Sequence, residues 1–373
     1  MKIQGAVLET IGRDRPYADS RPIVVTELDL DPPGPGEVLV RIEAAGVCHS
    51  DLSVVDGNRE RPVPMLLGHE AAGRIAEVGP GVADVFVGQR VVMTFLPRCG
   101  TCSACSTEGR LPCQPGSATN NAGTLLSGAT RLRRGDSVVN HHLGVSGFAS
   151  CTVVDRRSVV VVDDDVPPDV AAVLGCAVLT GGGAVVNAGR PGPGESVMVV
   201  GLGGVGMAAL LTALALHNGE VIGVDMVAEK RARARTAGAS AYSPQQVAEY
   251  GITASVVIEA AGSARALETA CAATAVGGTT VTVGLPAPSA RAAISPLSLV
   301  GGARSIVGSY LGSAVPERDI PKYAQMWREG RLPVEELITS RIQLSQINAA
   351  MDELANGNAV RQVIVFDQNR ELS

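Results

Sequence analysis

Short runs rich in Val and Ile fill the first part of the chain, and each run is bounded by Gly, Pro or Asp. Residues 38–47, 71–79 and 89–95 show this pattern, which is typical of β-strands. Their spacing predicts a compact β-barrel lobe that extends to about residue 170.

The pattern changes after Pro167 and Pro168. Residues 196–225 predict a strand, a glycine turn, an amphipathic helix and a second strand, which together form a βαβ unit. The alternation continues to the end of the chain, with strands expected at 254–262, 278–285 and 304–310, helices at 321–330 and 347–357, and a closing strand at 360–366. We therefore predict an α/β protein with a β lobe, a doubly wound parallel sheet, and a tail that returns to the first lobe.

Composition limits the classes of function. The 373 residues suffice for two domains, and with 46% hydrophobic but only 3% aromatic residues the cores must be built from Val, Ala and Leu. A net charge of −6 without a basic run argues against nucleic acid as a partner. No signal peptide and no stretch long and apolar enough to span a bilayer is expected, so we predict a cytoplasmic protein with no membrane partner.

Four cysteines fall within fifteen residues in the spacing C-x2-C-x2-C-x7-C, namely Cys99, Cys102, Cys105 and Cys113. Thiolates at this spacing can converge on one ion, and four-cysteine sites of this kind are typical of structural zinc. An iron–sulfur cluster and a pair of disulfides are the alternatives. Four protein ligands leave no room for a substrate, so chemistry must take place elsewhere. Cysteines that cluster like ligands also fit a reducing compartment.

A G-x-G-x-x-G turn lies between the first strand and the helix of the βαβ unit, at Gly201, Gly203, Gly204, Val205 and Gly206. Such a turn brings the backbone and the positive N-terminus of the helix close to a pyrophosphate. Asp225 ends the second strand, where a carboxylate accepts hydrogen bonds from the ribose of NAD and repels the 2′-phosphate of NADP. Lys230 and Arg231 follow and soften that preference. A glycine-rich turn with a capping Asp is the alternative to the predicted NAD site.

Three more candidate ligands stand in short motifs: Cys48 in GVCHSD, His69 in GHEAAG and Cys176 in GCAVLTG. Taken singly, each has an ordinary structural explanation, since buried cysteine is common and a lone His is more often structural. Together with the four cysteines, GVSGFASCTVV, GLGGVG and VRQVIVF, these motifs closely resemble the zinc-dependent medium-chain alcohol dehydrogenases over nearly the whole chain. The resemblance implies a GroES-like catalytic domain at 1–180 with a C-terminal return at 320–373, and a Rossmann NAD-binding domain at 181–319.

The resemblance also implies a catalytic zinc held by Cys48, His69 and Cys176, with water or substrate in the fourth position. Two zinc ions per chain are then expected, one catalytic and one structural. Asp51 and Glu70 correspond to carboxylates that orient the ligands or approach the zinc.

The resemblance also implies roles for single residues outside the zinc ligands. Ser50 matches the hydroxyl that bonds the substrate oxygen, and Thr180 a position near the nicotinamide. His49 and Arg361 match contacts to the cofactor pyrophosphate. Many family members have a His five residues after the first ligand, as the end of a proton relay, whereas this chain has Ser53. Because serine holds no proton as an imidazolium does, we expect slower alcohol oxidation at low pH.

The implied activity is hydride transfer between NAD(H) and a small-molecule alcohol, aldehyde or ketone. Phe95, His142 and Leu143 align with the substrate pocket and favour medium or bulky apolar substrates. The formaldehyde branch, which acts on a thiol adduct, carries a basic residue soon after the fourth cysteine. Residues 114–123 have none, which weighs against that branch without excluding another thiol carrier.

Three other functions remain as alternatives. In one, NAD stays bound and an external acceptor reoxidises it. In another, the chain is a non-catalytic dinucleotide-binding redox sensor whose four-cysteine site releases zinc on oxidation. A zinc-free reductase of the same superfamily predicts missing ligands, and all are present.

The long segment 114–143 fits the commonly dimeric branch, in which 304–310 pairs across a two-fold axis to make a homodimer.

Overall fold

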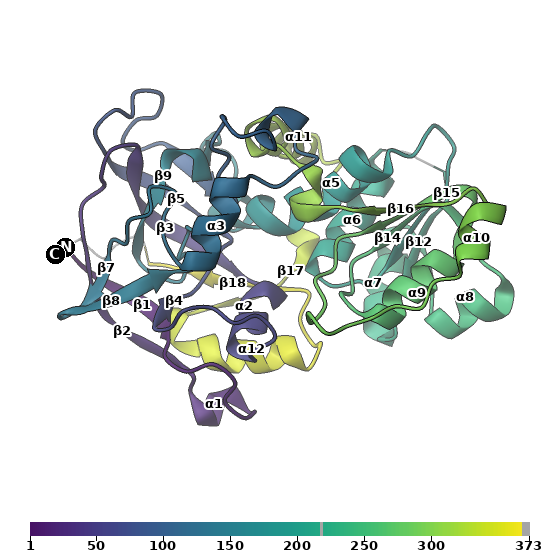
Figure 1. Ribbon diagram of the computed structural model, residues 1–373, viewed down its shortest axis with the longest axis horizontal. Coiled ribbons are helices and arrows are strands. Elements are labelled where there is room, and N and C mark those ends of the chain that lie inside the picture. Colours follow the sequence, from purple (N-terminus) through teal and green to yellow (C-terminus); the bar gives the residue numbers. More distant parts are fainter. Residues whose placement is uncertain (217–218, 368–373) are drawn as a thin grey trace. The chain divides into compact units, whose positions relative to one another are not determined.

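The structure, a computed structural model, describes residues 1–216 and 219–367, and the chain forms two units (Figure 1). The first comprises Met1–Cys176 and the chain from Ile338 on, and the second comprises Ala177–Leu337. The return to the first unit therefore begins at Ile338 and not at residue 320. Helix α11 (Pro316–Arg328) stays in the second unit because its buried Tyr323 packs there, close to Gly182 of helix α5 (Leu179–Gly183).

The first unit is built from two β-sheets. One is a closed barrel whose strands follow one another as β1 (Lys2–Leu8), β2 (Ile23–Leu30), β7 (Leu132–Arg134), β8 (Ser137–His141) and β4 (Met65–Leu66). The other has the order β10 (Val159–Val161), β6 (Arg90–Met93), β5 (Ala71–Val78), β3 (Glu37–Val47), β18 (Arg361–Val365) and β17 (Ile338–Ile342), with β9 (Cys151–Asp155) also paired to β3. The strands expected at 38–47, 71–79 and 89–95 are thus confirmed as β3, β5 and β6.

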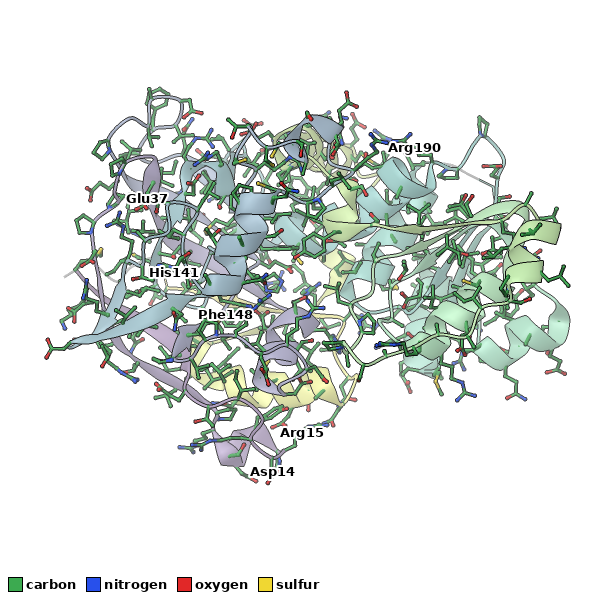
Figure 2. The ribbon with its side chains drawn as sticks, viewed as in Figure 1. Asp14, Arg15, Glu37, His141, Phe148 and Arg190 are labelled. Carbon is green, nitrogen blue, oxygen red and sulfur yellow. The ribbon has the colours of Figure 1, made fainter. Side chains whose placement is uncertain are left out.

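The core of the first unit is aliphatic, as the composition requires. Its members come from both sheets, and most are less than 2% exposed. Phe148 is the aromatic side chain among the largest that are fully buried, and Figure 2 labels it together with the buried His141. Interior side chains of this kind are Ile3, Val7, Leu28, Leu30, Leu66, Leu125, Leu132 and Val139.

The C-terminal return joins the first unit through a strand pair. Strand β18 runs antiparallel to β3, with Gln362 opposite Val47 and Val365 opposite Ala44. This register places Arg361 beside the end of β3, where Cys48 follows. The described part of the unit also contains the α-helices α1 (Tyr17–Ser20), α2 (His49–Val55), α3 (Gln114–Ala122), α4 (Pro168–Val173) and α12 (Ile347–Ala355).

The second unit has the predicted doubly wound sheet. Six parallel strands follow the order β13 (Ser240–Tyr242), β12 (Val221–Val224), β11 (Val197–Val200), β14 (Ala254–Glu259), β15 (Thr274–Thr282) and β16 (Ser305–Gly308). Parallel strands require crossover connections, which helices supply here. These are α6 (Gly204–Ala215), α7 (Ala228–Thr236), α8 (Pro244–Tyr250), α9 (Ala264–Ala272) and α10 (Pro296–Gly301).

One sequence-based expectation was wrong. The continuous helical segment Pro168–Gly189 is 22 residues long with a mean hydropathy of 1.8, and is therefore long and apolar enough to cross a membrane. However, 89% of its apolar window is buried inside the protein. A helix that is apolar on all sides is also what a protein core requires, so length and hydropathy alone do not make it a membrane span.

Asp352 on α12 ties the C-terminal return to the N-terminal segment. Its two carboxylate oxygens accept the N–H groups of Tyr17 and Ala18, each at 2.9 Å. Arg15, labelled in Figure 2, adds an ion pair at 3.6 Å. The carboxylate thus satisfies two N–H groups in the first turn of α1, which have no partner within the helix.

We expect Asp352→Ala to lower the free energy of unfolding by about 2 kcal/mol, because it leaves these N–H groups without an acceptor. Chemical denaturation followed by circular dichroism measures the change. Glu353→Ala, at the neighbouring exposed position, is the matched control and should stay within about 0.5 kcal/mol of the wild type. Equal effects of the two substitutions would contradict this role of Asp352.

Candidate active site and metal centres

The first candidate metal centre is assembled from three separate segments of the first unit. Cys48 lies at the N-cap of α2, directly after β3, and His69 follows β4. Cys176 lies in a π-helical turn, η3 (Leu174–Val178). A side chain on Gly175 would come within 2.3 Å of the Met93 carbonyl oxygen, so glycine is needed there for the helix to approach β6.

The donor atoms of this centre fit a zinc ion. One atom from each of Cys48, His69, Glu70 and Cys176 lies within 4.8 Å of the others, and all four residues are buried. Cys176 Sγ is 3.4 Å from His69 Nε2. Tetrahedral zinc with ordinary bond lengths sets these two donors about 3.5 Å apart. Two thiols and one imidazole are a donor set that zinc prefers, and they leave a fourth position open.

Asp51 fixes the orientation of His69. Its Oδ1 is 2.8 Å from His69 Nδ1, and its Oδ2 accepts the Cys48 N–H at 3.0 Å. Burial by itself lowers the pKa of His69, but the Asp51 carboxylate raises it well above the ordinary value. With Nδ1 bound to Asp51, Nε2 is the nitrogen left for a metal, which must displace any proton that it carries.

Glu70 and Arg361 form a buried charged pair behind the ligands. Arg361 Nη1 is 3.4 Å from Glu70 Oε2 and donates to the Val47 carbonyl at 3.1 Å. Burial raises the pKa of Glu70 to about 7, and Arg361 opposes that rise. Only 2% of Arg361 is exposed. Its expected contact with the cofactor pyrophosphate stays a prediction, because the partners that the structure gives it belong to the metal centre.

The remaining predicted residues of this region lie around α2 and His69. His49 is exposed and Ser50 half-buried in the first turn of α2. The Ser53 hydroxyl donates to the His49 carbonyl at 2.7 Å. The rings of Phe95 and His142 each stand edge-on to His69 with centroids 5.5 Å away. Two more predicted residues are buried, Leu143 in the first unit and Thr180 on α5 of the second.

The sequence interpretation placed His142 in the substrate pocket and missed its contact with the metal centre. His142 Nδ1 is 3.2 Å from Asp51 Oδ1, the oxygen that also serves His69. No sequence pattern connects these residues, because they lie in separate segments that only the folded barrel brings together.

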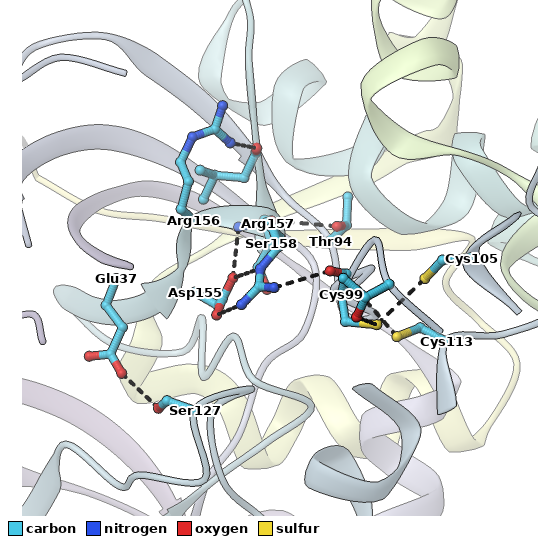
Figure 3. A network of polar contacts seen from close by, with 12 residues as sticks. Glu37, Thr94, Cys99, Cys105, Cys113, Ser127, Asp155, Arg156, Arg157 and Ser158 are labelled. Atoms are coloured by element: carbon cyan, nitrogen blue, oxygen red, sulfur yellow. Dashed lines mark hydrogen bonds and ion pairs between the residues drawn. The ribbon is translucent and has the colours of Figure 1, made fainter. Parts of the chain in front are cut away.

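The four-cysteine cluster forms a second, closed centre, and Figure 3 labels three of its members, Cys99, Cys105 and Cys113. Its four sulfurs lie within 4.8 Å of one another, with Cys102–Cys105 at 3.6 Å and Cys99–Cys105 at 3.9 Å. Tetrahedral zinc thiolate sites have sulfur–sulfur edges of about 3.8 Å. The Thr101 hydroxyl lowers the pKa of Cys99 to about 6, toward the thiolate form that binds metal. All eight cysteines of the chain lie in its described part and are free thiols, so the disulfide alternative is not realised.

The cluster is attached to the barrel through Arg157. Its guanidinium donates to both carboxylate oxygens of Asp155, at 2.8 and 3.0 Å, and to the Cys99 carbonyl at 3.3 Å (Figure 3). A cation held beside four thiols offsets the negative charge of a zinc tetrathiolate. Arg98 donates to the carbonyls of Ala104 and Cys105 within the loop.

The glycine turn of the second unit is shaped for a pyrophosphate. Gly201 has φ +93°, and a Cβ on Gly206 would lie 1.7 Å from the Gly201 carbonyl oxygen. Nothing lies within 4 Å of the Cβ position of Gly203, so the turn is open where a ligand would approach. Gly204 and Val205 begin α6, whose first N–H groups have no intrahelical partner.

Asp225 lies at the end of β12, next to this turn. Its oxygens accept the N–H groups of Leu202 and Val227, both at 2.8 Å, so the carboxylate is held at the turn. Arg231 Nη1 donates to the Asp225 and Met226 carbonyls, and Lys230 is half-buried on α7. These contacts fit a dinucleotide site with a fixed negative charge.

Comparison with known proteins agrees with both units. Residues 34–182 match the family described as Alcohol dehydrogenase GroES-like domain, and residues 204–329 match Zinc-binding dehydrogenase. A relative from Mycobacterium tuberculosis named "Putative alcohol dehydrogenase D" is 36% identical, over 98% of this chain and all of its own. The "NDMA-dependent alcohol dehydrogenase" of Amycolatopsis methanolica is 34% identical, over 98% of this chain and 99% of its own.

Solved structures show the same architecture. The benzyl alcohol dehydrogenase of Acinetobacter calcoaceticus superposes with a TM-score of 0.89 at 29% identity, over 98% of this chain and 100% of its own. The sequence motifs, the two-unit fold and these relatives agree with one another. The chain belongs to the zinc-dependent medium-chain alcohol dehydrogenases, and it is an oxidoreductase of that family.

Proposed function

We propose that the protein oxidises alcohols with NAD, or reduces the corresponding aldehydes and ketones with NADH, at a zinc ion held by Cys48, His69 and Cys176. The observation that carries this proposal is the convergence of those three donors in a buried site, with the Glu70 carboxylate beside them. If zinc takes only the three, its fourth position is left for water or substrate. The second zinc of the chain is proposed for Cys99, Cys102, Cys105 and Cys113, with a structural role.

The chemistry of the proposed reaction is divided between cofactors and protein. When bound, zinc supplies Lewis acidity that makes a substrate hydroxyl easier to deprotonate, and nicotinamide accepts the hydride. The chain contributes orientation and charge. Asp51 holds His69 with Nε2 directed to the metal, and Arg361 balances the charge of Glu70 in the same buried site.

The proton is proposed to leave through Ser50, which stands in the first turn of α2, two residues after Cys48. Ser53 does not continue this path in its present orientation, because its hydroxyl proton is directed to the His49 carbonyl. Passing a proton through Ser53 requires its hydroxyl to rotate first. This agrees with the slow oxidation at low pH expected from the sequence.

The substrate class is proposed from the side chains near the open position. Phe95 packs edge-on to His69, and Leu143 directly follows His142 in the chain; each is 7% exposed. Medium or bulky apolar primary and secondary alcohols fit such a lining. The similarity to an enzyme named benzyl alcohol dehydrogenase supports this class.

A second mode of cofactor use is favoured by one comparison. The relative named "NDMA-dependent alcohol dehydrogenase" covers nearly the whole chain, and its name indicates an acceptor other than free NAD. In this mode, NAD stays bound to the present protein and an external acceptor reoxidises it.

A panel of alcohols and aldehydes, assayed with NAD, NADP or NDMA together with metal analysis, tests the proposal. We expect two zinc ions per chain and turnover with added NAD. Turnover with NDMA alone would support the bound-cofactor mode. Cys48→Ala should lose one zinc and at least about a thousandfold in kcat, because Lewis acidity supplies several kcal/mol to such a step.

The matched control is Cys271→Ala, which removes a half-buried thiol on α9, outside both centres. It should keep both zinc ions and full turnover. NAD binding, followed by fluorescence, should survive in both variants because the glycine turn is unaltered. A Cys48→Ala protein that retained turnover would refute the zinc assignment.

The preference for NAD over NADP is proposed to depend on Asp225. Asp225→Asn keeps the shape of the side chain and removes its charge, so kcat/KM for NADP should rise roughly tenfold relative to NAD. Steady-state rates with both cofactors measure this ratio. Glu229→Gln, at an exposed position on α7, is the charge-matched control and should leave the ratio unchanged. A similar change in both variants would mean that net charge, and not Asp225, sets the preference.

We also propose that the chain acts in the cytoplasm as a homodimer. Its free cysteines support a reducing compartment. Strand β16 pairs with β15 on one side and exposes Ile306 and Val307. On the preceding helix α10, Leu297 and Val300 are 80% and 81% exposed. Apolar side chains beside an edge strand favour pairing with a second copy.

Val300→Asp should convert the dimer to a monomer, because it puts a charge into the interface at a position exposed in the single chain. Sedimentation velocity measures the mass. Tyr250→Ser alters another exposed side chain, on α8, which packs on β13 at the opposite edge of the sheet, and should remain dimeric. A monomeric wild type would contradict the proposed assembly.

A further inference from the structure

We propose that His142 is a positioning residue of the metal centre, which holds Asp51 and, through it, the zinc ligand His69. The inference rests on the proposed function, because it concerns the same zinc. It assigns His142 a role beyond the substrate pocket in which the sequence placed it.

The geometry centres on one oxygen atom. Asp51 Oδ1 is 2.8 Å from His69 Nδ1 and 3.2 Å from His142 Nδ1. The three side chains are at most 1% exposed, so water does not compete for that oxygen. The second oxygen, Oδ2, accepts the Cys48 N–H. One carboxylate therefore faces two imidazoles and the backbone of another ligand.

The tautomer of His142 follows from its surroundings. Its Nδ1 is buried, and no other polar atom among residues 1–216 and 219–367 forms a hydrogen bond with it. A lone pair on Nδ1 would face the negative Asp51 oxygen, whereas an N–H there is attracted by it. The approach is oblique, so the contact acts through charge and dipole more than through an aligned hydrogen bond. A neutral His142 therefore carries its hydrogen on Nδ1, toward Asp51.

A second contact involves His69 directly. The rings of His142 and His69 are 5.5 Å apart between centroids and nearly perpendicular, at 87°. Edge-to-face packing of this kind restricts rotation of the His69 ring. His142 thus constrains His69 both by packing and through the shared carboxylate.

The loop that carries His142 holds the ring in place. Leu143 and Ser146 both have φ +52°, and Gly144 has φ +66°. Left-handed backbone at two residues other than glycine costs about 1 kcal/mol or more each, so other contacts must maintain it. The His142 N–H donates to Ser146 Oγ at 3.0 Å, and the Ser146 N–H donates back to the His142 carbonyl at 3.1 Å.

Loss of His142 should affect how tightly the catalytic zinc is held. Replacing a residue that orients a metal ligand through a hydrogen bond lowers the metal affinity about 10–100-fold. Without His142, Asp51 retains two partners but loses the group that limits its rotation on one side. His69 is then less well oriented, and the catalytic zinc dissociates faster.

The test follows zinc release from the holoenzyme to a coloured chelator. Cys48→Ala, which lacks the catalytic zinc, identifies the phase that comes from the four-cysteine cluster. The informative pair is His142→Asn and His142→Gln. The Asn amide places an N–H near the former Nδ1, and the longer Gln amide places it near the former Nε2.

We expect His142→Gln and His142→Leu to speed the catalytic phase about 10–100-fold, and His142→Asn to stay within a few fold of the wild type. The cluster phase should be unchanged in all three, which reports an intact barrel. The Asn–Gln comparison decides the question even where the Leu variant fails to fold.

Three results would overturn the inference. If all variants kept the wild-type catalytic phase and changed only KM for the alcohol, His142 would be a pocket residue alone. If Asn and Gln sped the phase equally, the effect would be general loosening and not the placed N–H. A wild type that showed the cluster phase alone would instead refute the proposed catalytic zinc, and this inference with it.

Discussion

The structure depends on burying a cluster of charges without leaving any of them uncompensated. Asp51, His69, Glu70 and Arg361 are each 2% exposed or less, and an isolated charge at such depth costs several kcal/mol. They neutralise one another only if β3, α2 and β18 meet at one place. The antiparallel pairing of β18 with β3 achieves this, because its register carries Arg361 to Val47 and Glu70. The C-terminal return is therefore part of the metal centre as well as of the fold.

The two metal centres differ in how the chain supplies their ligands, and this difference matches their roles. The four-cysteine cluster takes all its donors from residues 99–113, so it forms locally and closes on itself. The other centre draws donors from three segments far apart in the sequence, and it exists only when the first unit is complete. Glu70 also lies beside these donors, and its ion pair with Arg361 gives its carboxylate a partner other than the metal.

Sequence patterns predicted the structural features that depend on residues close together in the chain. The strands around β3, the βαβ unit and the four-cysteine spacing are local signals, and the structure contains each of them. The start of the return was missed because an amphipathic helix such as α11 has the same pattern whichever unit it packs on. Segment Pro168–Gly189 was missed as a long apolar helix. Its Gly175 and Gly181 permit close packing against the neighbouring backbone, which buries the segment inside the protein. The contact of His142 with Asp51 has no local signal at all.

The placement of His142 constrains how the substrate pocket of this chain can change. A residue that only lines a pocket is free to vary with the substrate, since its replacement alters shape and little else. Leu143, proposed to line the pocket, has no polar side-chain group to lose, although its left-handed backbone, φ +52°, limits which residues can replace it. His142 shares its carboxylate with a zinc ligand, so a substitution that enlarges the pocket there also loosens the metal. Phe95 lies between these cases, because its ring packs edge-on to His69 without touching Asp51 through a polar group. Changes in substrate preference should therefore accumulate at Leu143 before they reach Phe95 or His142.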